Sequence, residues 1–128
     1  MENKIQWYDD DKRLLQYTFS GCWNTESALD TLTNGQENYL NTVTHHVDVI
    51  LDFRQVDFEH EPLNLIRISH YLRENPIANL GRSIIVSQNK LAYSMLSILQ
   101  PITGKALYGI YAASTLPDAL KLYHSFYE

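Results

Sequence analysis

Four acidic residues follow one apolar segment and are the first candidates for chemistry. Asp52, Asp57, Glu59 and Glu61 come at and after the end of the aliphatic run at positions 49–51. Grouped carboxylates can bind a divalent cation or act as general acid and base. They also suit a solvated loop, and Glu61 precedes an expected helix, whose dipole favours an acid. No phosphate-binding glycine loop and no GxSxG elbow accompanies them. We therefore predict neither a catalytic site nor a metal site here.

The histidines do not suggest a metal site either. His45 and His46 are adjacent, and neighbouring side chains point apart on an extended chain. His60 and His70 form no HxH or HxxxH pair, and the chain has one cysteine, Cys22, to assist them. We predict packed or solvated histidines, and no cofactor.

The hydrophobic pattern predicts the elements that position these residues. Short alternating or continuous apolar runs indicate strands, and apolar residues at helical spacing after a capping residue indicate helices. The second expected helix carries Leu65, Ile66, Ser69 and Leu72 along its stripe. Gly35 lies inside the first helix, where it marks a close helix–sheet contact or a break. Strands are expected at 4–8, 14–19, 47–53, 83–86 and 107–112, and helices at 25–40, 62–75, 87–100 and 115–127.

This alternation predicts one α/β domain over residues 1–128. The order ββαβαβαβα is typical of a mixed, mostly parallel sheet with an N-terminal hairpin and about four helices. Gly21 is expected to close the second strand, and Asp52 to stand near the end of the third.

Composition and charge exclude some classes of partner. The chain has ten Lys and Arg residues and fifteen Asp and Glu residues, for a net charge of −5. This charge disfavours binding to nucleic acid and to anionic membrane surfaces. Cys22 cannot form an internal disulfide, and no apolar run approaches about 18 residues, so we expect a cytoplasmic protein. Nine tyrosines favour an interface or a binding groove.

A ligand site at the strand ends is an alternative. In open α/β sheets, ligands bind beyond the carboxyl ends of parallel strands. Ser87, Asn89 and Ser114 follow two expected strands and are the candidate ligand-binding residues, for a nucleotide or a lipid-like molecule. The same side chains also suit helix caps.

The segment at positions 49–62, VILDFRQVDFEHEP, carries a family resemblance. A buried strand that ends in an acid, Asp52, is followed by a short loop with two apolar residues, Val56 and Phe58, before the next helix. In this respect the chain resembles the STAS domain of anti-sigma-factor antagonists, and the expected order of elements agrees along nearly the whole chain. The resemblance implies a non-enzymatic signalling module that binds a kinase-like or signalling protein, or a second copy of itself as a homodimer.

The chain departs from that family at the regulatory position. Where the family has Asp-Ser-Ser-Gly, this sequence has His60, Glu61, Pro62 and Leu63. Proline has no hydroxyl to phosphorylate, and Glu61, which we expect to be exposed, carries about one charge against roughly two for a phosphate. Docking through the same helix end stays open, as do the ligand sensor and an enzyme built on the acidic residues. The predicted contact residues are Asp57, Glu59, His60, Glu61, Pro62, Asn64, Arg67 and Ile68.

Overall fold

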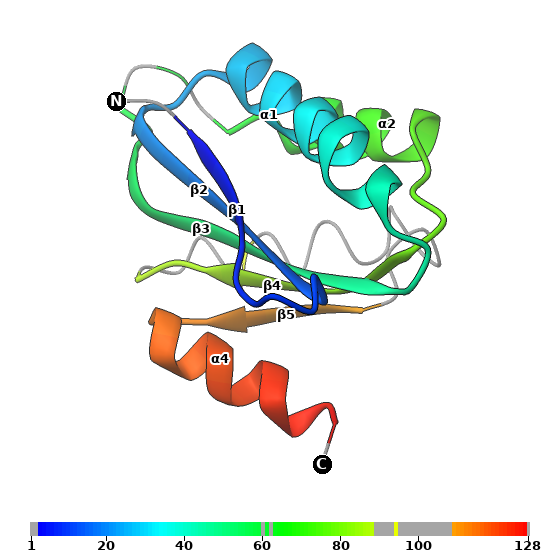
Figure 1. Cartoon of the computed structure of the whole chain (residues 1–128). Coiled ribbons are helices and arrows are strands. Elements are labelled where there is room, and N and C mark those ends of the chain that lie inside the picture. The colour runs from blue at the N-terminus through cyan, green and yellow to red at the C-terminus, as the bar shows by residue number, and fades with distance from the viewer. Residues whose placement is uncertain (1–2, 60, 62, 89–93, 95–108, 128) are drawn as a thin grey trace.

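Five strands form one mixed sheet in the order β1-β2-β3-β4-β5 (Figure 1). The computed structural model describes residues 3–59, 61, 63–88, 94 and 109–127. β1 pairs antiparallel with β2, and the remaining neighbours are parallel, which confirms the hairpin and the mostly parallel sheet. The strands are β1 (Lys4–Trp7), β2 (Leu14–Cys22), β3 (Val47–Asp57), β4 (Leu80–Val86) and β5 (Ile110–Ala113).

Helices cover both faces of this sheet. Helices α1 (Thr25–Asn38) and α2 (Leu65–Glu74) lie on one face, and α4 (Leu116–Ser125) lies on the other (Figure 1). A short 3-10 helix, η1 (Leu40–Thr42), follows α1. Because consecutive parallel strands are added in one direction, right-handed crossovers place α1 and α2 on the same face. The helix expected at 87–100 falls almost entirely outside the described residues.

Side-chain caps explain where the three α-helices of the described residues begin. Asn24 accepts a hydrogen bond from the amide of Ser27 at 2.8 Å, and Thr115 accepts one from Asp118 at 3.2 Å. Asn64 caps α2, so this helix begins at Leu65 rather than at Pro62 as predicted.

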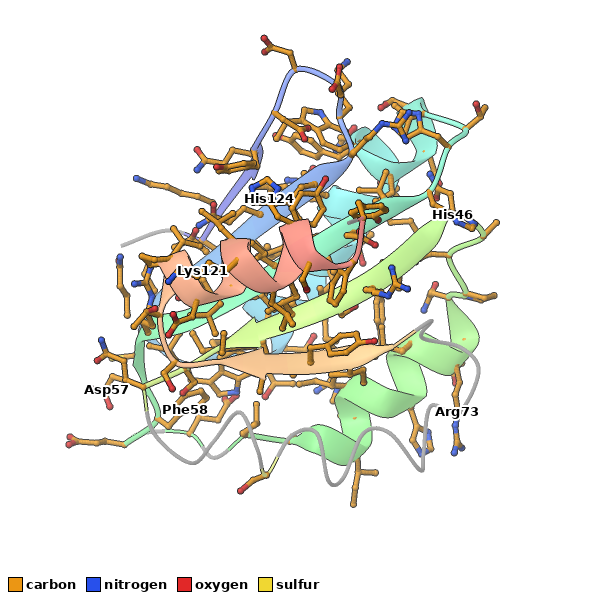
Figure 2. The ribbon with its side chains drawn as sticks, turned by 90° about the horizontal axis from the view of Figure 1, so that it is seen from below. His46, Asp57, Phe58, Arg73, Lys121 and His124 are labelled. Atoms are coloured by element: carbon orange, nitrogen blue, oxygen red, sulfur yellow. The ribbon has the colours of Figure 1, made fainter. Side chains whose placement is uncertain are left out.

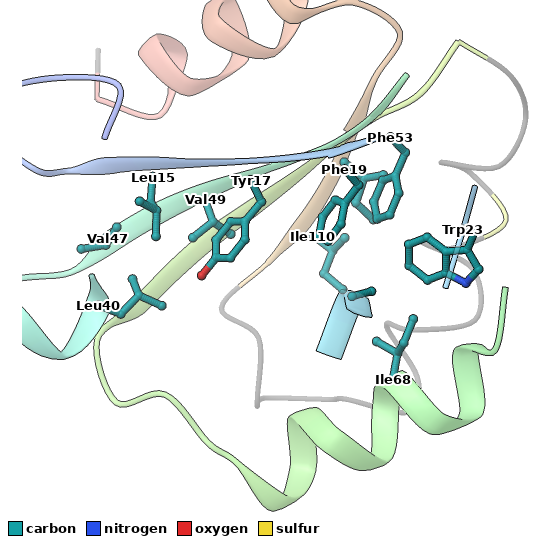
Figure 3. Close-up of a cluster of buried hydrophobic side chains, with 12 residues drawn as sticks. Leu15, Tyr17, Phe19, Trp23, Leu40, Val47, Val49, Phe53, Ile68 and Ile110 are labelled. Carbon is teal, nitrogen blue, oxygen red and sulfur yellow. The ribbon is translucent and has the colours of Figure 1, made fainter. Parts of the chain in front are cut away.

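Side chains along each strand alternate between the two faces of the sheet and so contribute to two hydrophobic cores. On β2, Leu15, Tyr17 and Phe19 face α1 and α2, whereas Leu14 belongs to the core under α4. Figure 3 shows the first cluster, in which the Phe19 and Phe53 rings stack at 4.9 Å. β3 contributes to both cores, as its continuous apolar run predicts.

β4 begins at Leu80, before the predicted Ser83, and β2 and β3 run several residues past their predicted ends. β2 continues through Gly21, which adopts a φ of 78°, to Cys22, and β3 continues past Phe53 to Asp57. The two extensions pair with each other through Cys22 and Asp57. The prediction that Asp52 stands near the strand end is therefore wrong.

Asp52 instead lies within β3, buried, with its charge matched by Arg54. Arg54 Nε donates to Oδ1 at 3.0 Å and Nη2 donates to Oδ2 at 2.8 Å. A buried carboxylate is tolerated when a guanidinium and hydrogen bonds satisfy it. The hydrogen bond to Asp52 also raises the pKa of Arg54.

Candidate functional site

The loop after β3 begins at the carboxyl edge of the sheet, where Asp57 fixes its direction. The carbonyl of Asp57 accepts a hydrogen bond from the amide of Trp23 at 2.7 Å. Its side chain accepts one from the amide of Glu59, also at 2.7 Å, which is an Asx turn. The Phe58 ring lies 5.3 Å from the Trp23 ring (Figure 2 labels Asp57 and Phe58). The start of the loop is thus anchored on the core.

Glu61 connects this loop to the N-terminus of α1. Its Oε2 accepts a hydrogen bond from the amide of Thr25 at 2.5 Å. Hydrogen bonds from the side chain and then the backbone of Thr25 hold the pKa of Glu61 below its usual value. The dipole of α1 favours an acid at this end. The expectation of an exposed Glu61 is therefore wrong: the side chain is partly buried and engaged with α1.

Helix α2 presents a different face from the one predicted. Ile68 is buried at 8% exposure in the core, and Leu72, one turn later, packs against the same cluster. Ile66 is 69% exposed, although the sequence places it on the buried stripe. The prediction that Ile68 is a contact residue is therefore wrong, because α2 is oriented so that Ile68 and Leu72 face the core.

The remaining contact residues of α2 lie at its surface. Asn64 is exposed and accepts a hydrogen bond from the amide of Arg67 at 3.0 Å. The Arg67 guanidinium forms an ion pair with Glu26, which joins the first turns of α2 and α1. Asp57, Glu59, Glu61, Asn64 and Arg67 are thus brought to one edge of the molecule. His60 and Pro62 lie outside the described residues.

The three predicted ligand-binding residues differ in their exposure to solvent where the structure describes them. Ser87 is buried at 4% exposure, and its amide donates to the carbonyl of Ala113 at 3.1 Å, continuing the β4–β5 pairing. Ser114 is exposed, next to Thr115, which caps α4. Asn89 is outside the described residues.

The acidic residues do not converge on a common point. Asp52 is bound by Arg54, Asp57 by the amide of Glu59, and Glu61 by Thr25. In the described part of the chain, no group of three or more His, Cys, Asp or Glu side chains is arranged to hold a metal ion. His45 has a separate contact, between its Nε2 and the carbonyl of Lys12 at 2.8 Å.

Comparison with known proteins gives little further information. No family model matches the chain. It is similar to the arginine-specific large chain of carbamoyl phosphate synthase from Cutaneotrichosporon cutaneum, with 27% identity over 96 residues. That match covers 68% of this chain and 8% of that protein, so the chain spans a small part of its relative. Among the described residues, no helix has the length and apolar character needed to cross a membrane.

Proposed function

We propose that this chain is a STAS-like protein-interaction module that acts without catalysis in the cytoplasm. Its contact surface is the loop after β3 together with the exposed side of α2, which we call the loop–α2 surface. The described residues of this surface are Asp57, Glu59, Glu61, Asn64, Ile66 and Arg67.

The scaffold supports the STAS-like assignment through its central segment. The hairpin and the parallel strands follow one another in sequence order across the sheet. Val56 and Phe58, which match the family's apolar positions, pack against the core cluster. Asp52 is buried, as a core strand requires, but it lies within β3 rather than at the strand end where the resemblance has its acid.

Ile66 is the observation on which the interaction function rests. Its side chain is 69% exposed beside the Arg67–Glu26 ion pair. Removing an exposed apolar side chain from water is favourable, so a partner that covers Ile66 gains binding free energy. Tyr8 and Tyr127 are also exposed, but they lie on other elements.

Contacts with the rest of the domain fix the conformation of the described part of the loop before it binds a partner. Asp57 holds the amide of Trp23, and Glu61 holds that of Thr25. A fixed loop loses less conformational entropy when it binds. Because Glu61 supplies a permanent charge and Pro62 has no hydroxyl, we propose that binding is constitutive rather than switched by serine phosphorylation.

The partner is a kinase-like or signalling protein, or a second copy of this chain. Its location in the cytoplasm is supported by Cys22, an exposed and unpaired thiol, which suits a reducing compartment.

Co-purification from the cells of origin tests this function with a matched pair of variants. Ile66→Asp places a charge on the loop–α2 surface, whereas Tyr8→Asp places one on another exposed apolar position. We expect Ile66→Asp to lose the partner recovered by wild type and by Tyr8→Asp, with an unchanged melting temperature. Recovery of the same proteins with all three chains would overturn the proposal.

A further inference from the structure

A cavity of about 80 Å³ lies between the sheet and helices α1 and α2. Its lining includes Tyr17 of β2, Ala28 of α1, Ile68 of α2 and Ile110 of β5. Figure 3 shows Tyr17 pointing from the sheet toward the helices and Ile68 pointing from α2 toward the sheet. Protein interiors have few voids larger than a water molecule, so a space of this volume is a candidate binding site.

The described lining carries two hydroxyls, those of Tyr17 and Ser83, among apolar and aromatic side chains. Both residues are 3% exposed. Within the described part of the chain, neither hydroxyl has a hydrogen-bond partner. By contrast, the indole nitrogen of Trp23, another lining residue, donates to the hydroxyl of Thr25 at 3.2 Å.

The two hydroxyls reach the open space of the cavity. Every fully buried side-chain nitrogen or oxygen of the described residues has a partner, so these two oxygens are in contact with the cavity that their residues line. A hydroxyl withdrawn from water without a partner is unfavourable, and such groups are rare in native proteins. A ligand oxygen inside the cavity would supply the missing hydrogen bond.

The surroundings of the Tyr17 hydroxyl do not satisfy it. The hydroxyl lies against Gly35 of α1, which has no side chain. Tyr71 and Tyr39 both act on it electrostatically, but each is engaged elsewhere. The hydroxyl of Tyr71 shares a hydrogen bond with that of Thr33 at 2.7 Å, and Tyr39 donates to a carbonyl of β1 at 3.3 Å. Because burial raises the pKa of Tyr17, its hydroxyl keeps the proton and acts as a donor.

The volume and the lining restrict the ligand to a small, uncharged molecule. One water molecule takes about 30 Å³ in the liquid, so the cavity has room for roughly three to five carbon or oxygen atoms. Among the described residues, no charged side chain lines the cavity. An ion would lose its hydration there without compensation.

We propose that this cavity binds a small, uncharged aliphatic molecule whose carbonyl or hydroxyl oxygen accepts a hydrogen bond from Tyr17. Removal of the hydrocarbon part from water drives the binding. A packing defect that is empty or holds water predicts no saturable binding. The cavity lies on the inner side of α2, whereas Ile66 of the loop–α2 surface is exposed, so either proposal can fail without the other.

Titration of the whole chain with butanone tests the site. Methyl NMR shifts of Ile68 and Ile110 report binding, and the methyl groups of Ile50, in the core under α4, are the reference. The second compound is the alkene in which a methylene group replaces the oxygen of butanone. We expect saturable shifts with both compounds. Tyr17→Phe should raise the Kd of butanone about three- to tenfold, the effect of one hydrogen bond, and leave that of the alkene unchanged.

Tyr123→Phe is the matched control, because it changes a buried tyrosine in the other core. It is expected to bind butanone as wild type. Ala28→Leu extends a larger side chain into the cavity and should abolish the binding of both compounds. Methyl spectra recorded without either compound show that each variant is folded.

Tyr17→Phe is the decisive variant because it keeps the ring and removes the hydroxyl alone. Shifts that rise linearly with butanone concentration in wild type would overturn the proposal. One butanone Kd for wild type and Tyr17→Phe would overturn it as well.

Discussion

The hydroxyl of Tyr127 donates a hydrogen bond to Oδ2 of Asp48, and this contact ties the chain after α4 to the start of β3. Asp48 is buried, so its carboxylate depends on the few donors that reach it. Burial, and then the contact with Asp48, raises the pKa of Tyr127 to about 12. The α4 layer is therefore attached to the sheet at this point by a polar contact as well as by its apolar core.

Replacing Tyr127 with phenylalanine tests that attachment. Because the change removes a donor from a buried carboxylate, we expect the free energy of unfolding to fall by about 1–3 kcal/mol at neutral pH. Urea unfolding measures it, with Tyr8→Phe, at an exposed ring, as the control. Equal unfolding free energies for the two variants would contradict the role of Tyr127.

The pH dependence of the same variant follows from the raised pKa. The folded state holds the Tyr127 proton more tightly than the unfolded state, where the pKa is about 10. The stabilisation is complete below about pH 10 and is lost as pH rises through about 12. The difference in stability between wild type and Tyr127→Phe should shrink over that interval, as urea unfolding at a series of pH values would measure. A constant difference would argue against the assigned contact.

Gly35 allows helix α1 to approach the sheet. A Cβ at this position would lie 2.1 Å from the hydroxyl oxygen of Tyr17 and 2.5 Å from Cζ. Alanine favours a helix by about 1 kcal/mol over glycine, but we expect Gly35→Ala to destabilise by about 1–3 kcal/mol through overpacking. Thermal unfolding measures this. A second change, Tyr17→Leu, should cost less in the Gly35→Ala background than in wild type. Additive effects would show that the two residues are not coupled.

Glu61 should contribute to stability only while it is charged. Its pKa is lowered in the folded state, so its contribution is present above the ordinary value of about 4.3 and is lost as pH falls below it. We expect Glu61→Gln to melt below wild type at about pH 7 and together with it at about pH 3. Glu59→Gln, in the same loop and exposed, is the control. An unchanged melting temperature at both pH values would exclude the Thr25 contact as a stabilising one.

The ion pair inside β3 gives a further test. Arg54→Met removes two side-chain donors from Asp52, which is 1% exposed. We expect the free energy of unfolding, measured in urea, to fall by about 1–3 kcal/mol. The fall should be smaller when Arg54→Met is made in a chain that already carries Asp52→Asn. Gln55→Met changes the exposed neighbour and should be close to neutral. The pair would have no stabilising role if Arg54→Met and Gln55→Met unfolded alike.

Local sequence signals predict most of the architecture. The β1–β2 hairpin and the buried inner strand follow from turn chemistry and continuous apolar runs. The Thr115 cap of α4 follows from a pattern within a few residues of the helix start. The sequence predicts either a break or a close contact at Gly35, and the position of Tyr17 shows that it is a close contact.

The sequence pattern fails to predict features that depend on contacts between residues distant in the sequence. β3 extends to Asp57 because β2 supplies a partner as far as Cys22, which the pattern of either strand alone does not reveal. Ile66 and Ile68 are both apolar on a short helix, so tertiary packing decides which of them is buried. Tyr17, Ala28 and Ile110 meet at one cavity only in the folded chain.

Photo-crosslinking within the cells of origin tests the central claim, the loop–α2 surface, most directly. A photoreactive amino acid replaces Ile66 in one chain and Tyr8 in another, and the crosslinked products are identified by mass spectrometry. The interaction module predicts a discrete protein product, either a signalling protein or a second copy of this chain, from position 66 and not from position 8. The same products from both positions, or none from position 66, would contradict it.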